Sequence, residues 1–484
     1  MSASQDHPNI LWICSDQQRF DTLGCYGNPF VRTPHIDRLA LEGTLFEQAY
    51  SQSPVCTPSR AAFLTGRYPR TTRDRQNGQC IPPDEHLITH FLAEHGYHCG
   101  LSGKLHLSVC NPKAGYASEP RIADGYSEFH WSHHPAPDWP ANEYGQWLDA
   151  KGVPYATPDR ADCAYVQTGM PAEFHQTTWC VEKAVDFMRA HQAVQQPWLF
   201  SINLFDPHHP FDPPASYLER YLPILDQIPL PNYQPGELDN KPGFQRNDHS
   251  GGYSNPSLYP FDKMSDRDHR LVRAAYWAMC DLIDDQVGRL MEALRQTGQA
   301  ENTIVVYMSD HGEMLGDHGI YLKGPYFYDP AVHVPLIVWQ PGRVQSGQRV
   351  SGLVELTDIA PTLLEAAGFA PLPGMQAQSL WPLCIGQTPG DTFRADVYCE
   401  YYNAMPWHKE PAANTTMLRT RHYKLVAVHG LKEGELYDLA SDPGETTNLW
   451  HDPAHQAMKL EMYIDLCDRM AWTVDPLPAR EAAW

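Results

Sequence analysis

The segment that organises this chain is Val55-Cys56-Thr57-Pro58-Ser59-Arg60-Ala61-Ala62-Phe63-Leu64-Thr65-Gly66. Its residue order predicts a helix, because Pro58 suits the first turn, where its missing N–H would be unpaired in any case, and Gly66 suits the end. Cys56 then precedes a helix N-terminus, where free N–H groups and the helix dipole favour negative charge. Arg60 adds a fixed cation one turn later. The segment therefore predicts an anion-binding site with a reactive sulfur at its mouth.

On both sides of this segment, short apolar runs alternate with helical patterns. The apolar runs cover residues 9–14, 97–101, 198–205, 303–308 and 334–339, and the longer helical patterns cover 33–43, 85–94, 177–192, 268–297 and 357–367. Continuous apolar runs suit strands that are buried on both faces. The alternation predicts an α/β fold in which helices sandwich a large, mostly parallel sheet.

The pattern changes after Gly386, where short candidate strands cluster at 397–398, 417–419, 424–426 and 435–437. These predict a smaller antiparallel sheet with a helix near the end of the chain. We therefore expect a catalytic α/β domain over 1–386 and an α+β subdomain over 387–484.

Two stretches, 111–171 and 213–262, are rich in Pro, Gly and aromatic residues and show little periodicity. We expect long loops there, which are common places for substrate selectivity. Their aromatic side chains could stack on a sugar or aryl group, or could simply pack the loops, and the sequence leaves both interpretations open. These residues are Tyr116, Tyr126, Trp131, Trp139, Tyr144, Trp147, Tyr253 and Tyr259.

Composition excludes some functions. The formal charge of −22, from 36 basic and 58 acidic residues, argues against a nucleic-acid or anionic-membrane partner. No apolar stretch is long enough to cross a bilayer. Met1–Pro8 is short and polar and lacks a secretory pattern, which predicts a cytoplasmic protein. The twelve cysteines include no Cys-x-x-Cys, so we expect free thiols in a reducing compartment.

Polar side chains follow four of the predicted strands. Ligands of parallel sheets bind beyond the carboxyl ends of the strands, so we expect these groups to converge, although each one alone would usually be a turn former or a helix cap. The groups are Asp16-Gln17, Lys104 with His106, His208, and Asp310-His311. Because oxygen donors dominate among Asp16, Gln17, Asp310 and His311, they predict a site for a hard divalent cation.

The run Cys56-Thr57-Pro58-Ser59-Arg60 followed by Leu64-Thr65-Gly66 resembles the signature of the type I sulfatases. Asp310-His311-Gly312-Glu313-Met314-Leu315-Gly316-Asp317-His318 resembles the second signature of that family, and Gly103-Lys104-Leu105-His106 matches a further motif. The resemblance covers most of the chain and implies an alkaline phosphatase-like fold. It also implies that a formylglycine-generating enzyme oxidises Cys56 to formylglycine, whose hydrated aldehyde is the nucleophile.

The resemblance also implies roles for individual residues. Asp16, Gln17, modified Cys56, Asp310 and His311 would bind the metal, which is calcium in sulfatases. The commonest pairs in the family are Asp-Asp and Asp-Asn, whereas Gln17 and His311 resemble a subgroup that includes the manganese-dependent phosphonate monoester hydrolases. We therefore expect Ca²⁺, with Mn²⁺ as the alternative.

The remaining roles concern the sulfuryl group and the protons. Arg60, Lys104 and Lys323 would hold the sulfuryl oxygens. His208, assisted by Lys323, would protonate the leaving alkoxide, with neighbouring His209 as the alternative, and His106 would take a proton. Asn77 is a candidate contact with the substrate or an ordinary turn residue.

The resulting hypothesis is hydrolysis of a small-molecule or carbohydrate sulfate monoester to an alcohol and inorganic sulfate. The first alternative is a phosphonate monoester or phosphodiester hydrolase on the same scaffold. The others are a non-catalytic anion-binding relative in which Cys56 is unmodified, and a thiol hydrolase that uses Cys56 with a His. The sequence leaves open whether the protein is a monomer or a homo-oligomer.

Overall fold

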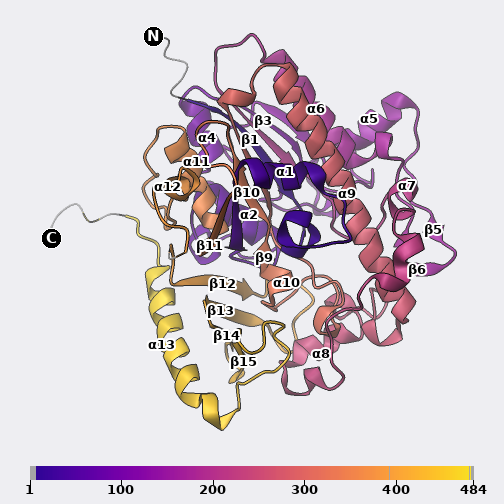
Figure 1. The fold of residues 1–484 in the computed structure, drawn as a ribbon, viewed down its shortest axis with the longest axis vertical. Coiled ribbons are helices and arrows are strands. Elements are labelled where there is room, and N and C mark those ends of the chain that lie inside the picture. The colour runs from indigo at the N-terminus through magenta and orange to yellow at the C-terminus, as the bar shows by residue number, and fades with distance from the viewer. Residues whose placement is uncertain (1–6, 392, 479, 481–484) are drawn as a thin grey trace.

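A nine-stranded sheet forms the centre of the computed structural model, which describes residues 7–391, 393–478 and 480 (Figure 1). The strand order is β11-β2-β10-β8-β1-β7-β3-β4, and β9 pairs with β2. The strands are β1 (Asn9–Ser15), β2 (Thr44–Tyr50), β3 (His98–Gly103), β4 (Glu128–Trp131), β7 (Trp198–Asn203), β8 (Thr303–Ser309), β9 (His333–Val334), β10 (Leu336–Trp339) and β11 (Gln348–Glu355). Only β9 and β10 run antiparallel to their partners in this described sheet, so the prediction of a mostly parallel sheet is confirmed.

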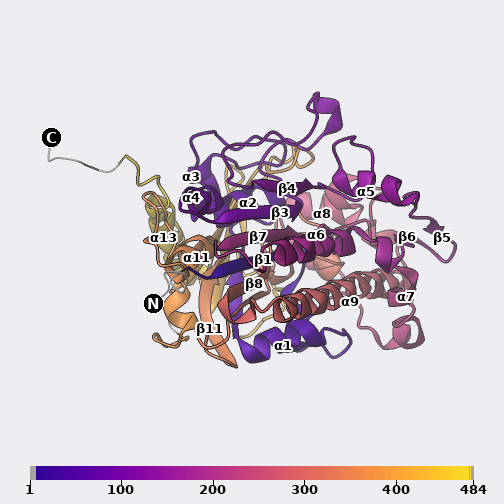
Figure 2. The same ribbon diagram turned by 90° about the horizontal axis from the view of Figure 1, so that it is seen from above.

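Both faces of the large sheet are covered by helices, because successive strand residues point to opposite faces. In β1, Leu11 and Ile13 pack in one buried cluster, and Ile10 and Trp12 pack in another. The first cluster lies under α1 (Pro34–Glu42), α6 (Gln176–Ala190) and α9 (Asp266–Gln296) (Figure 2). The second lies under α2 (Cys56–Thr65), α4 (Ile88–Glu94), α11 (Ile359–Ala366) and α12 (Trp381–Cys384).

A separate antiparallel sheet follows, with strand order β12-β13-β14-β15 (Figure 1). Its strands are β12 (Asp396–Tyr402), β13 (Asn414–Thr420), β14 (Tyr423–Val428) and β15 (Glu433–Asp438). One face packs on α13 (Gln456–Trp472) through Leu418, Leu425 and Met462, and the opposite face joins the core of the larger unit. The predicted fold class is thereby confirmed, while the boundary at residue 386 stays a prediction.

The two stretches predicted as loops contain more regular structure than expected. Residues 111–171 include β4 at the edge of the large sheet, together with α5 (Glu143–Lys151), β5 (Asp159–Arg160) and β6 (Cys163–Gln167). Residues 213–262 include α7 (Ala215–Leu218) and α8 (Gly243–His249). The sequence did not predict β4, because only Trp131 of its four residues is buried. Its sequence therefore shows no alternation of apolar and polar residues. The two remaining short helices are α3 (Pro69–Thr72) and α10 (Asp329–Val332).

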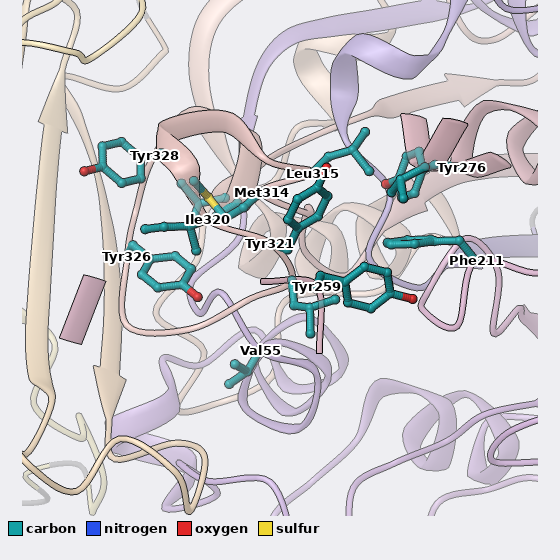
Figure 3. Close-up of a cluster of buried hydrophobic side chains, with 14 of the residues drawn as sticks. Val55, Phe211, Tyr259, Tyr276, Met314, Leu315, Ile320, Tyr321, Tyr326 and Tyr328 are labelled. Carbon is teal, nitrogen blue, oxygen red and sulfur yellow. The ribbon is translucent and has the colours of Figure 1, made fainter. Parts of the chain in front are cut away.

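An aromatic-rich core supports the segment that follows β8. Figure 3 shows Tyr321 of that segment beside Tyr259, which in turn packs on Phe211, while Tyr326 and Tyr328 lie on the other side of the same buried cluster. The hydroxyl groups of buried tyrosines need hydrogen-bond partners. Tyr326, for example, donates to Oδ2 of Asp248 at 3.0 Å. This packing fixes the chain on both sides of Lys323.

Two expectations from composition concern the whole chain. None of the helices within the described ranges combines the length and apolar character that crossing a bilayer requires. All twelve cysteines lie in the described ranges as free thiols. Residues 1–6 of the N-terminal stretch that carried the prediction of location lie outside the described residues.

Candidate active site

Cys56 is the first residue of α2 and is almost completely buried, at 1% exposure. The helix ends as predicted at Gly66, whose φ of 68° is left-handed and therefore suits glycine. Asn77 accepts a hydrogen bond from the free N–H of Thr57 at 3.0 Å. Asn77 therefore fixes the helix start beside the nucleophile candidate, besides lining the cavity above it.

The carboxyl ends of four neighbouring strands bring the predicted site residues together. In the sheet order, β8, β1, β7 and β3 are consecutive. Their polar ends therefore lie at one edge, which confirms that the four strands are neighbours. The groups that follow them are Asp310-His311, Asp16-Gln17, His208, and Lys104 with His106, respectively.

The sulfur of Cys56 is surrounded by charged and basic groups. Its Sγ lies 3.0 Å from Nζ of Lys323, 3.1 Å from Nε2 of His311, 3.5 Å from Nζ of Lys104 and 3.7 Å from Oδ1 of Asp16. Burial and Asp16 act to raise the pKa of the thiol, but the two ammonium groups and His311 outweigh them and lower this pKa to about 5. The site is therefore built to hold negative charge at residue 56.

The candidate metal ligands also converge. Ligand atoms of Asp16, Cys56, Asp310 and His311 all lie within 4.8 Å of one another. Nδ1 of His311 donates to the carbonyl oxygen of Gly312 at 2.9 Å, so Nε2 is the nitrogen that faces Sγ and that would bind a metal once it has lost its proton. This arrangement fixes the imidazole tautomer that a metal requires.

The side-chain oxygen of Gln17 indicates whether the candidate ligands fit a metal ion. Its amide nitrogen donates to the carboxylate of Glu313, and its buried Oε1 has no hydrogen-bond partner among the described residues. An unpaired buried oxygen is unusual and is satisfied by a cation. The donor set of carboxylates, one amide oxygen and one imidazole therefore fits a divalent metal ion. Glu313 belongs to the second motif, but the sequence alone gave it no role.

Arg60 lies beneath the cavity rather than in its wall. Its Nε contacts Oδ2 of Asp310 at 2.9 Å, its Nη2 lies 3.5 Å from Oδ2 of Asp16, and its Nη1 donates to the backbone oxygen of Lys104 at 2.9 Å. Lys104 also pairs with Asp16. Arg60 therefore holds the two carboxylates in place.

Lys323 and His208 form a hydrogen-bonded pair. Nδ1 of His208 donates to the backbone oxygen of His209 at 2.6 Å, so its Nε2 accepts from Nζ of Lys323 at 2.9 Å. Burial and Lys323 lower the pKa of His208, which keeps the imidazole neutral. His209 lines the same cavity without a described hydrogen bond to Lys323, so the geometry favours His208 of the two.

His106 is held by a carboxylate that the sequence did not reveal. Glu119 accepts from the backbone N–H groups of His106 at 3.0 Å and Leu107 at 2.6 Å, and from Nε1 of Trp131 at 3.1 Å. These bonds hold His106 in a left-handed conformation, with a φ of 56°. No sequence pattern links a loop glutamate to backbone groups twelve or thirteen residues away.

A cavity of about 530 Å³ opens above Cys56. Its lining includes six of the residues predicted from sequence, namely Cys56, Asn77, Lys104, His106, His208 and Lys323. Further out, Tyr253 stacks on Trp407, with ring centroids 4.7 Å apart and an angle of 18°. Trp407 and Met405 come from the loop between β12 and β13. The predicted division into two units gave no sign that this loop reaches the cavity.

The aromatic residues of the two long loops can now be divided. Of the eight, Tyr253 alone lines this cavity among the described residues. Tyr126, Trp131, Trp139 and Tyr144 are buried, with Tyr126 and Tyr144 in the clusters on the two faces of the large sheet, whereas Tyr116 is 48% exposed. Packing is therefore the main role of this set.

One buried acid near the site has no hydrogen-bond partner within the part of the chain that the structure describes. Asp74 precedes Asn77 in the same loop, is fully buried, and neither of its carboxylate oxygens has a described hydrogen-bond partner. Burial, together with Glu119 and Glu85, raises the pKa of Asp74 to about 8. This group is therefore protonated in the folded protein at neutral pH.

Comparisons with known proteins match almost the whole chain. The family model described as Sulfatase matches residues 8–369, and one described as N-sulphoglucosamine sulphohydrolase, C-terminal, matches residues 316–471. An arylsulfatase of Clostridium perfringens is 30% identical over 459 residues, 91% of this chain and 90% of that protein. An ulvan-active sulfatase of Formosa agariphila is 28% identical over 480 residues, 98% of this chain and 83% of that protein. The solved structure of a phosphonate monoester hydrolase from Silicibacter pomeroyi matches with a TM-score of 0.82 and 27% identity, and the match covers 97% of this chain and 96% of that one.

Proposed function

This chain belongs to the sulfatase family of sulfuric ester hydrolases, within the alkaline phosphatase superfamily, and we propose that it cleaves its sulfate monoester with residue 56 as the nucleophile after Cys56 has been oxidised to formylglycine. One observation carries the proposal. The side chain of residue 56, at the floor of the cavity, is met by Lys323, His311 and Lys104 at 3.0 to 3.5 Å. This environment suits an oxyanion better than a neutral thiol.

The formylglycine hydrate supplies two hydroxyls on one carbon, one to attack sulfur and one to expel sulfate and restore the aldehyde. A metal bound by Asp16, Gln17, Asp310 and His311 supplies positive charge beside these hydroxyls. Our first expectation is Ca²⁺, with Mn²⁺ as the alternative that the imidazole favours.

The cations of the chain hold the substrate. Lys104 and Lys323, both almost fully buried, line the cavity on the side of residue 56, so each is placed to neutralise a sulfuryl oxygen. Arg60 acts through Asp310 and Asp16, whose positions it fixes. This role is more indirect than the contact with sulfuryl oxygens that the family resemblance implies.

Two histidine groups move the protons. Lys323 shares a proton with Nε2 of His208, and this pair is placed to protonate the leaving alkoxide. His106 remains neutral because burial and Lys104 lower its pKa. A neutral imidazole can accept the proton of the second hydroxyl when sulfate leaves.

The test of the nucleophile combines mass and turnover. We expect the peptide containing residue 56 to carry formylglycine in protein made with a formylglycine-generating enzyme. Both Cys56→Ala and Cys56→Ser then abolish turnover, while Cys467→Ser on the exposed side of α13 retains it. Normal turnover of either Cys56 variant would overturn the proposal, and a peptide with only unmodified Cys56 would favour the non-catalytic relative. Inactivation by a thiol-alkylating reagent would instead favour a thiol hydrolase.

A second candidate function is phosphonate monoester hydrolysis. Gln17 and His311 occupy the metal-site positions that resemble that subgroup, and the solved phosphonate monoester hydrolase matches nearly the whole chain.

For the alcohol, the relatives' names point to aryl and polysaccharide sulfates. The cavity offers Trp407 and Tyr253 for stacking, and its described lining contains no carboxylate or arginine. Turnover of aryl, alkyl and sugar sulfates decides among these alcohols.

A further inference from the structure

A second group of metal-binding side chains lies in one wall of the cavity, apart from the oxygen-rich group described above. His106 and Cys110 lie on the loop after β3, and His133 lies just after β4. One ligand atom from each of the three residues lies within 4.8 Å of the other two. The imidazole rings of His106 and His133 have centroids 4.5 Å apart. All three residues line the cavity that opens above Cys56.

A second observation is that both imidazoles of this group have a buried nitrogen without a described partner. Nδ1 of His106 and Nδ1 of His133 are both buried, and neither has a hydrogen-bond partner among the described residues. His106 is only 7% exposed. Among the described residues, Sγ of Cys110 lies 3.4 Å from the backbone oxygen of Ser108 and also interacts with the carboxylate of Glu119. Buried imidazole nitrogens without partners are costly, and coordination would satisfy them.

The loop that carries His106 is held in place by Glu119. Glu119 fixes the loop of His106 through the backbone N–H groups of His106, Leu107 and Ser108. The carboxylate of Glu119 is buried, and the charge of Lys104 is paired with Asp16. The ligands therefore need little rearrangement to close on an ion.

We propose that His106, Cys110 and His133 form a binding site for a thiophilic transition metal, with Zn²⁺ as the ion that fits best. Two imidazoles and one thiolate are typical zinc ligands and leave a fourth position for water, whereas the group around Asp310 offers mainly oxygen donors for a hard cation. Because binding occupies the imidazole of His106, zinc inhibits sulfate ester turnover. The inhibition rests on the proposed role of His106, but the binding itself does not.

The binding is tested with Co²⁺ as a spectroscopic probe in full-length Cys56→Ala protein preloaded with Ca²⁺. We expect one equivalent of Co²⁺ to produce thiolate-to-cobalt charge-transfer absorption, which Zn²⁺ then displaces. Cys110→Ser removes the absorption, and His133→Gln weakens cobalt binding at least tenfold. The matched control Cys80→Ser, which alters an exposed cysteine, leaves the absorption unchanged. Absent absorption in the parent protein, or full absorption in folded Cys110→Ser, would overturn the proposal.

A separate arm tests the consequence for catalysis. In protein with converted residue 56, we expect Zn²⁺ to inhibit aryl sulfate turnover, and His133→Gln to raise the inhibitory concentration at least tenfold relative to its own uninhibited rate. Equal zinc sensitivity of the two proteins would contradict inhibition through this site. If the protein turns over no sulfate ester at all, the proposed function fails while the cobalt titration still decides the metal site.

Discussion

The substitution Glu313→Gln tests whether Glu313 orients the side-chain amide of Gln17 toward the metal. The Glu313 carboxylate is fully buried and accepts from the backbone N–H groups of Leu315 at 2.9 Å and Leu322 at 2.5 Å, and from the amide nitrogen of Gln17. A glutamine at 313 has a single oxygen. If that oxygen keeps the two backbone bonds, its NH₂ faces the NH₂ of Gln17. The Gln17 amide must then flip, which points its own NH₂ where Oε1 lies now.

The magnitude follows from this flip. The metal loses one oxygen ligand and meets an N–H instead, and disturbing the groups that orient a metal ligand typically lowers metal affinity about 10- to 100-fold, or roughly 1.4 to 2.7 kcal/mol. The metal-free protein keeps its hydrogen bonds after the flip, so we expect its free energy of unfolding to change by less than about 1 kcal/mol.

The assay is a competition titration of metal-free protein against a fluorescent chelator, with Ca²⁺ and with Mn²⁺. Glu301→Gln, which changes an exposed glutamate beside β8, serves as the matched control and should bind metal like the parent. Unchanged affinity of folded Glu313→Gln for both ions would refute the reasoning. Lost affinity accompanied by a large loss of stability would show a structural role rather than an orienting one.

Three further predictions concern charge, pH and the cavity wall. Arg60→Met leaves the buried carboxylates of Asp310 and Asp16 without their arginine. We therefore expect chemical denaturation of the metal-free protein to show a free energy of unfolding that is lower by about 3 to 5 kcal/mol, and added metal to recover part of this loss. A change near zero would contradict the role of Arg60. For Asp74, the folded pKa of about 8 exceeds the unfolded value, so the folded state binds more protons between these values and stability falls as pH rises from about 4 to 8. Asp74→Asn should remove a slope of up to about 1.4 kcal/mol per pH unit from unfolding free energies measured at intermediate pH, and identical slopes would be the opposing result. Trp407→Ala removes the stacking partner of Tyr253. KM for aryl sulfates should therefore rise about 5- to 30-fold with little change in kcat. An unchanged KM would show that the aryl group does not bind against Trp407.

The sequence predicts the central sheet well because its strands are buried on both faces. Every residue of β1 and β8 is buried, so the apolar runs are continuous and unambiguous. The polar groups at their ends converge because parallel neighbours end at one edge. Asp16, Lys104, His208 and Asp310 could therefore be chosen before the structure was known.

The parts that were missed depend on contacts between distant segments. Glu119 bonds backbone groups of another loop, and Trp407 reaches the cavity from the loop between two strands of the small sheet. The placement of Arg60 under the carboxylates likewise comes from packing, since its position in the motif is equally compatible with direct contact to the substrate. Periodicity and motifs carry no signal for such contacts.

The most direct measurement is kcat/KM for matched aryl sulfate and aryl phosphonate monoesters, using metal-replete protein in which conversion of residue 56 has been verified by mass. The account predicts a clear preference for the sulfate ester, lost in Cys56→Ala. A preference for the phosphonate, also lost in Cys56→Ala, would contradict the sulfatase assignment while keeping residue 56 as the nucleophile.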